Sequence, residues 1–321
     1  MFSSPVLFSA ACLIWGSTFW AITLQLGHVA PAVSIIYRFG LAAATLFAWC
    51  LVRGDKLVLP WKVQRWMMAQ GFATFAVSYL CTYTSEEHLI SALVAVLFAL
   101  MVIWTPICSR IMFGTALTWR TWGAAAVAII GVTMLFYDSI HASWKDIVAG
   151  GAGHFLLGLG LALTATIAGT IGNMMVVKVR AHSSNVLLTM AWAMLWGTLF
   201  VTAFALATGV HFTLPSSTSY WGGLVYLSLF GSVIAFAAYF TLIHRWGAQK
   251  AVYIGVVTPV ISVLMSIQLE SYRPGPVEWL GMVLCLSSVA WVLKSPAPAA
   301  KKPSTDPTPI HEPDHTSSRT A

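Results

Sequence analysis

Charged side chains are rare in this sequence, so each one that lies inside an apolar run is a candidate for function. Charged residues make up 8% of the 321 residues, and hydrophobic residues make up 58%. Arg38 is the only basic residue well inside an apolar run, where a charge is costly and usually functional. The alternative is that its long side chain reaches the membrane interface. Glu87, in the corner after residue 85, is the acid that could pair with it.

A pair formed by Arg38 and Glu87 would suit gating or ion coupling. A carboxylate that is partly buried beside a cation can take up and release a proton, so proton coupling is one expectation. The competing interpretation of Glu87 is a solvated loop acid like its neighbour Glu86, since acids are seldom buried. At the level of sequence both interpretations of this corner stay open.

Aromatic and amide side chains inside the apolar runs suit a substrate that has an apolar or aromatic part. A ring with a polar tip offers both a flat apolar surface and a hydrogen bond, and an amide in a membrane must face protein or a cavity. The alternatives are core packing, an aromatic belt at the interface and hydrogen bonds between helices. We expect these residues to contact the substrate: Trp15, Tyr79, Asn173, Tyr239 and Tyr253.

Motifs of cofactor chemistry are absent from the sequence. It contains no metal-ligand spacing, no nucleophile motif and no phosphate-binding glycine loop. The 5 cysteines all fall in apolar runs, which is typical of buried thiols. We therefore expect no enzyme activity, no metal, no cofactor and no drive by ATP.

The elements that must hold these side chains are membrane-spanning helices. About 20 apolar residues in a row cross the roughly 30 Å of hydrocarbon as a helix, and a soluble fold would have too little interior for this hydrophobic content. The sequence predicts an all-α integral membrane protein with ten transmembrane helices, near 7–27, 32–52, 66–85, 90–113, 119–137, 150–177, 185–207, 220–243, 250–269 and 277–294.

Lys and Arg residues divide unevenly between the two sides of this arrangement. Of the 17 Lys and Arg residues, all but Arg38, Lys145 and Arg273 lie in connections on one side or in the C-terminal segment. Such a bias marks the cytoplasmic side, so we expect a multi-pass protein of the bacterial cytoplasmic (inner) membrane with both termini in the cytoplasm. The bias also accounts for the net charge of +7 without a nucleic-acid partner. The expected partners are the lipid bilayer and a small-molecule substrate.

Ten spans divide into two halves of five, and the second half then enters the membrane from the opposite side. We therefore predict two inverted five-helix repeats, residues 1–137 and residues 138–294. The alanine-rich sequence near 89–106 is similar in composition to the sequence near 251–266. The remaining segment, 295–321, is rich in Pro, Ser and Thr, and we expect it to be a disordered cytoplasmic tail.

Several motifs, taken in order, resemble the EamA-type transporters of the drug/metabolite transporter superfamily. The first half carries IWGSTF (14–19), YRFGLAAA (37–44) and SEEHLISALVAVLFAL (85–100), and the second half carries RWGAQKAVYIGVVTPVISVLMS (245–266). The family usually has a Gly-Glu pair after its fourth and ninth spans. The first half departs from this pattern, because it reads FGTAL with Thr115 in place of the acid.

This resemblance implies a ten-helix inverted-repeat bundle that moves small metabolites, often outward. We therefore expect a secondary transporter that exports small metabolites such as amino acids by alternating access. Two other classes are a non-transporting membrane sensor or scaffold and an intramembrane enzyme. The enzyme would need converging His, Asp or Glu residues at depth, whereas the deep charge in this sequence is Arg38.

Overall fold

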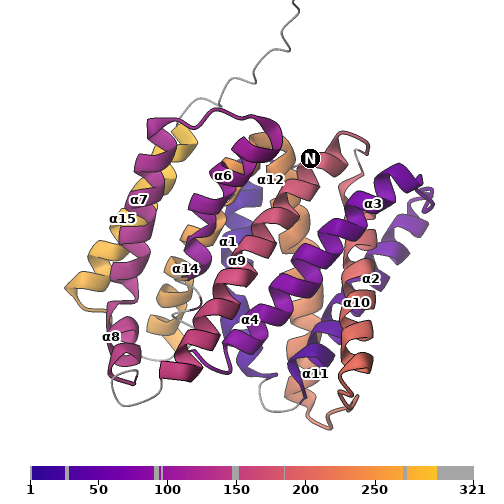
Figure 1. Ribbon diagram of the computed structural model, residues 1–321, viewed down its shortest axis with the longest axis horizontal. Helices are drawn as coiled ribbons and strands as arrows, with labels where there is room; N and C mark the ends of the chain where they lie inside the picture. Colours follow the sequence, from indigo (N-terminus) through magenta and orange to yellow (C-terminus); the bar gives the residue numbers. More distant parts are fainter. Residues whose placement is uncertain are drawn as a thin grey trace, which may run out of the picture.

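Figure 1 shows the computed structural model as a bundle of helices. The structure describes residues 2–25, 29–89, 94, 97–146, 152–183, 185–269 and 273–294. Within these residues every regular element is a helix, which confirms the predicted all-α fold. The segment 295–321, which we expected to be a disordered tail, lies outside the described residues.

The helices of the first half follow the predicted spans. The third predicted span is one continuous helical rod whose middle is π-helical. In chain order the elements are α1 (Ser4–Thr23), α2 (Pro31–Val52), α3 (Trp61–Gln70), the π-helical η1 (Gly71–Ser78), α4 (Tyr79–Ser85), α6 (Met101–Phe113) and α7 (Trp119–Leu135).

The second half repeats this order. Its eighth predicted span is again a rod with a π-helical middle, and its ninth is divided between a short helix and a long one. The elements are α9 (Ala152–Arg180), α10 (Val186–Ala207), α11 (Thr218–Tyr226), the π-helical η3 (Leu227–Ile234), α12 (Ala235–Trp246), α13 (Ala248–Ala251), α14 (Ile254–Leu269) and α15 (Pro276–Lys294).

The connection between the halves differs from the sequence expectation. The predicted spans leave residues 138–149 as a polar connection between 119–137 and 150–177, but the structure has a helix there, α8 (Tyr137–Asp146). Asp138 lies in its first turn, where a negative charge is favourable. The rings of Tyr137 and His141, four residues apart, stack with centres 6.2 Å apart. Local contacts of this kind stabilise a helix although the segment is polar.

Helix ends in the bundle follow from the local sequence. Thr118, Asn185 and Ser217 each precede a helix, and each side chain accepts a hydrogen bond from the backbone amide three residues further on. Such caps satisfy amides that have no partner within the helix. Gly114 ends α6 with a φ of 66°, a left-handed value that glycine adopts without strain.

Six helical stretches are long and apolar enough to cross a membrane. They are Pro31–Val52, Gly153–Arg180, Val186–Ala207, Thr218–Trp246, Ala248–Met265 and Pro276–Lys294. Shorter apolar helices cover Ser4–Thr18, Leu97–Phe113 and Trp119–Leu135. The chain is therefore a multi-pass membrane protein, and the number of ten spans stays a prediction.

The two halves pack on one another through matching contacts. α1 packs on α12 and α14 of the second half, and α9 packs on α4 and α6 of the first half. α2 pairs with α10, and α7 pairs with α15, side by side in Figure 1. The two π-helical segments occupy equivalent places, as do Pro106 in α6 and Pro259 in α14. These correspondences describe two structural repeats.

Small residues allow the helix pair α7 and α15 to pack closely. A side chain at Gly281 would collide with the backbone of Gly131 and Leu135, and a side chain at Gly131 would collide with Cys285. Small residues at such crossings let helix backbones approach each other. The pair therefore forms a closely packed scaffold to one side of the helices that line the central cavity.

Candidate functional site

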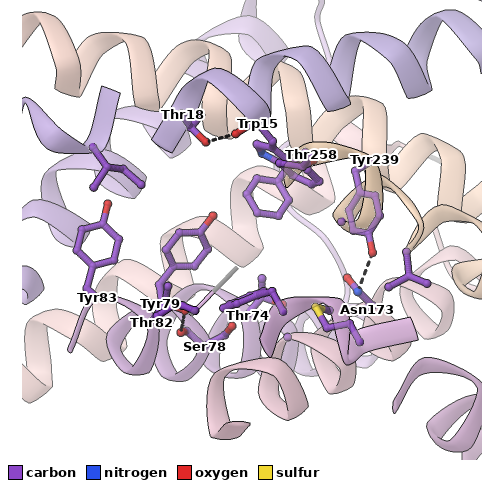
Figure 2. Close-up of a pocket in the computed structure, with 18 of the residues that line it drawn as sticks. Trp15, Thr18, Thr74, Ser78, Tyr79, Thr82, Tyr83, Asn173, Tyr239 and Thr258 are labelled. Atoms are coloured by element: carbon purple, nitrogen blue, oxygen red, sulfur yellow. Dashed lines mark hydrogen bonds between the residues drawn. The ribbon is translucent and has the colours of Figure 1, made fainter. Parts of the chain in front are cut away.

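A cavity of about 220 Å³ lies between helices of both halves (Figure 2). Its wall includes residues of α1, α2, η1, α4, α6, α9, α12 and α14. The aromatic side chains on the wall are Trp15, Tyr79, Tyr83, Phe98, Phe236 and Tyr239. The other polar side chains are Thr18, Arg38, Thr74, Ser78, Thr82, Glu86, Asn173 and Thr258.

Aromatic rings form an apolar side of the cavity. The Trp15 indole meets the rings of Phe236 and Tyr239 edge to face, with ring centres 5.1 and 5.2 Å away. Tyr79 meets Phe39 edge to face at 4.6 Å and lies 6.4 Å from Phe236. Because such contacts favour particular ring orientations, the wall offers a preformed aromatic surface to a ligand.

The π-helical segment η3 explains the position of the Trp15 ring. In a regular α-helix the Ala235 amide would donate to the carbonyl oxygen of Gly231, but here it donates to Phe230 and Ser232 oxygens instead. The Trp15 Nε1–H donates to the Gly231 oxygen at 3.0 Å. A carbonyl displaced from the α-helical pattern thus holds the indole of α1 against the second half.

Arg38 faces this cavity from α2. Its side chain is 2% exposed, so the alternative that it reaches the membrane interface is wrong. Its Nε donates to the Ser232 hydroxyl at 2.9 Å, and its Nη1 donates to the Tyr83 hydroxyl at 3.3 Å. The guanidinium carbon lies 5.2 Å from the ring centre of Tyr79 and 5.4 Å from that of Phe39, which is cation–π distance.

The predicted pair of Arg38 and Glu87 is not formed in this structure. Arg38 bonds to hydroxyl groups, and Glu87 is exposed in the turn after α4. Glu86 lines the cavity instead, and burial raises the pKa of its carboxyl to about 7. The reason is helical spacing, because Glu86 follows Tyr79 by seven residues and Thr82 by four, which puts all three on one face.

Asn173 and Tyr239 are hydrogen-bonded to each other on the cavity wall. The Asn173 Nδ2 donates to the Tyr239 hydroxyl at 2.8 Å (Figure 2). Asn173 is 3% exposed, and the bond satisfies an amide that would be expensive to bury unpaired. The bond links α9 to α12, so these two predicted contact residues lie side by side.

Tyr253 does not line the cavity, in contrast to the other aromatic residues that we expected there. It is buried, and its hydroxyl finds no hydrogen-bond partner among the described residues. Residues 252 and 253 form a turn between α13 and α14. This break in the helix places Val252 and Gly255 on the cavity wall, a change of register that an unbroken helix near 250–269 does not predict.

A comparison with protein-family models matches the EamA-like transporter family at residues 3–137 and 156–294. The chain belongs to the EamA-like transporter family. The two matched stretches correspond to the two structural repeats, and this family lies within the superfamily that the sequence motifs resemble.

This EamA-like chain is similar to curated transporters over most of its length. It is 26% identical to the uncharacterized inner membrane transporter YedA of Escherichia coli K12, over 88% of each chain. It is 23% identical to the probable amino-acid metabolite efflux pump of that organism, over 88% of this chain and 92% of the other. It is 24% identical to the biotin transporter of that organism, over 70% and 73%. One crystal structure matches the fold with a TM-score of 0.72 at 16% identity, over 90% of this chain and 96% of that chain.

One polar stripe of this EamA-like cavity was missed in the sequence. Thr74, Ser78 and Thr82 recur every four residues along η1 and α4, and Glu86 follows at the same spacing in the turn after α4; all four line the cavity. A side chain at Gly172 of α9 would collide with the Thr74 hydroxyl, so glycine leaves room for this stripe. A search for polar residues at a period of four within an apolar run would have found it.

The family departure at Thr115 has a structural counterpart. The Thr115 hydroxyl lies 2.8 Å from the Ser109 hydroxyl of α6, and it accepts a hydrogen bond from the Gln249 Nε2 at 3.3 Å. Gln249 belongs to α13 of the second half. At the position where the sequence resemblance led us to expect an acid, this chain therefore has a neutral hydroxyl that contacts the other half.

Proposed function

We propose that this EamA-like protein is a secondary transporter of a bacterial inner membrane that exports small metabolites, amino acids among them, by alternating access. The observation that carries the proposal is the cavity, because helices of both halves form its wall. A tilt of residues 1–137 against residues 138–294 would open such a cavity first to one side and then to the other. The relatives named inner membrane transporter and amino-acid metabolite efflux pump support the membrane, the direction and the substrate class.

In this proposal Trp15, Tyr79, Asn173 and Tyr239 contact the substrate. All four line the cavity, and ring contacts or hydrogen bonds hold each of them in place. Tyr253 does not line the cavity, so we assign it a structural role in the turn between α13 and α14 and no contact with the substrate.

The position of cations at helix ends supports cytoplasmic termini. Arg245 at the end of α12 donates to the carbonyl oxygen of Phe2 at 2.8 Å, and Arg180 at the end of α9 donates to the carbonyl oxygen of His244. These contacts gather the chain start and two basic helix ends at one end of the bundle. A gathering of positive charge marks the cytoplasmic side, and ten crossings would return the chain to that side.

Counterflow in liposomes tests the transport function. Liposomes that contain the full chain and an excess of one unlabelled metabolite should accumulate the labelled form of a compound from a panel of amino acids, organic acids, amines and neutral metabolites. Asn173→Trp fills the cavity and should abolish accumulation, whereas Gly222→Ala adds a methyl group in open space and should preserve it. Absence of counterflow for the whole panel, with protein that is folded and inserted, would refute the proposed function.

A further inference from the structure

Arg38 is a buried positive charge without a carboxylate partner in the described part of the chain. Its guanidinium contacts the neutral hydroxyls of Ser232 and Tyr83 and the rings of Tyr79 and Phe39. Burial of an ion costs several kcal/mol by order of magnitude unless an opposite charge or good hydrogen bonds compensate it. Hydroxyls and ring faces compensate part of this cost, so a negative group brought into the cavity would be stabilised there.

Glu86 is not the missing counterion. It is the other charged residue on the cavity wall, but no hydrogen bond or ion pair joins it to Arg38, whose bonds in the described part of the chain go to Ser232 and Tyr83. The cavity therefore contains a cation and a separate acid that do not neutralise each other.

The guanidinium has hydrogen-bond donors to spare. It carries five N–H donors, and its bonds to Ser232 and Tyr83 use Nε and Nη1. Nη2 makes no hydrogen bond to any residue that the structure describes. A side chain at Gly231 would come within 3.3 Å of this Nη2, so glycine at that position leaves the atom uncrowded. The guanidinium fork of Nη1 and Nη2 matches the two oxygens of a carboxylate.

The size and chemistry of the cavity restrict the rest of the ligand. About 220 Å³ is less than the roughly 300–1,000 Å³ typical of pockets for drug-sized ligands, so the ligand is small. Trp15, Tyr79 and Phe236 present an aromatic surface to the same space. A ligand with a carboxylate at one end and an apolar body at the other would satisfy both features.

We infer that Arg38 anchors the carboxylate of the transported molecule, so that the substrates are small organic acids with an apolar or aromatic body, amino acids included. This inference rests on the proposed function for its biological setting. Its central claim, recognition of a carboxylate by Arg38, concerns binding and can be measured without transport.

Ligands that share one body and differ in the head group test the inference. The thermal stability of the full chain in detergent is measured with 3-phenylpropionate, 3-phenylpropanamide and 3-phenylpropylamine, and again with hexanoate, hexanamide and hexylamine. A charge-assisted pair of hydrogen bonds is worth about 1.5–3 kcal/mol, so an acid should bind about tenfold or more tightly than its amide. Arg38→Gln should remove this preference, and Arg38→Lys should restore part of it.

Ser232→Ala is the matched control, because it removes a partner of Arg38 but leaves the charge. It should keep the preference for acids. Equal binding of acid, amide and amine to the wild type would overturn the inference. So would an equal loss of acid and amide binding in Arg38→Gln and Ser232→Ala, since Arg38 would then act on the packing alone.

The two proposals fail in different ways. Binding of acids that depends on Arg38, without counterflow of any compound, would refute transport and keep the carboxylate anchor. Counterflow of amines and amides as readily as acids would keep transport and refute the anchor.

Discussion

The two helical rods that line much of the cavity are built alike and present different chemistry. Both contain a π-helical segment of 8 residues, Gly71–Ser78 in the first half and Leu227–Ile234 in the second. Besides two tyrosines, the first rod presents the small hydroxyls of Thr74, Ser78 and Thr82 to the cavity, and the acid Glu86 follows its end. The second rod presents only Phe236 and Tyr239 among the described residues. The repeat therefore determines the shape of the cavity, and the side chains that differ between the repeats determine what it can bind.

The second pair of equivalent helices differs in the same way. α2 carries Arg38, whereas α10 contains no charged residue. Arg38 crosses to Ser232 in the π-helical segment of the other half. The single buried cation of this wall thus belongs to one repeat and is held by the other, which makes the cavity chemically asymmetric.

Substitution of the glycines in the two π-helical segments should have the largest effect on stability and should differ between the two halves. A side chain at Gly71 would collide with the backbone of Ala193 and Gly197 in α10, which cannot move aside. A side chain at Gly231 would meet side-chain ends of Thr18 and Arg38 at 3.0 and 3.3 Å. We expect Gly71→Ala to lower the free energy of unfolding by about 3 kcal/mol, the upper end of the usual cost of overpacking. We expect Gly231→Ala to cost less and to weaken acid binding at Arg38.

Thermal unfolding of the purified variants in detergent measures the first effect, and ligand-induced stabilisation measures the second. Gly222→Ala is the control for the added methyl group, because its surroundings are open; it should be neutral or slightly stabilising. Equal losses of stability for the variants at Gly71 and Gly231 would show that the two segments have the same structural role.

Two tyrosines should respond differently to loss of the hydroxyl, because Tyr239 lies on the cavity wall and Tyr253 lies in the core. Tyr239→Phe would leave the Asn173 amide without its acceptor, at a cost of about 2 kcal/mol for an unsatisfied buried donor. Tyr253→Phe would remove a buried hydroxyl that has no partner among the described residues, so the stability should change by less than about 0.5 kcal/mol. Thermal unfolding of both variants checks the difference, and a larger loss for Tyr253→Phe would reveal an interaction of its hydroxyl.

The scaffold could be predicted from the sequence because membrane helices obey strong local rules. The length of each apolar run matches the hydrocarbon thickness, and glycine and proline mark the turns and interruptions. The helix α8 was missed because the polarity of 138–149 suggested a loop, while ring stacking between Tyr137 and His141 and a first-turn acid favour a helix.

The cavity could be predicted only in part, because tertiary contacts decide which side chains face it. Trp15, Tyr79, Asn173 and Tyr239 line it as the sequence suggested. The partners of Arg38 lie 45 and 194 residues away in the chain, a distance that no local pattern reveals. The choice between two adjacent acids, by contrast, was available from helical periodicity.

Those adjacent acids should give the smallest effect. The pKa of the Glu86 carboxyl is raised from 4.5 to about 7 by burial, so the folded protein binds this proton more tightly than the unfolded chain. The contribution of Glu86 to the free energy of unfolding is therefore largest below about pH 4.5 and is lost as the pH rises through about 7. Gln does not ionise, so we compare the free energy of unfolding of Glu86→Gln with that of the wild type at each pH. The variant should gain stability relative to the wild type between pH 5 and pH 8, by up to about 1 kcal/mol after allowance for solvent screening.

Glu87→Gln provides the matched control, since Glu87 is exposed and its variant removes a carboxylate from the same turn. The same pair decides where a coupling proton would bind. If a proton moves with the substrate, counterflow by Glu86→Gln should no longer respond to an imposed pH gradient, while Glu87→Gln should respond like the wild type. A response that is lost in Glu87→Gln and kept in Glu86→Gln would assign the proton to the exposed acid, and burial on the cavity wall would then have no part in coupling.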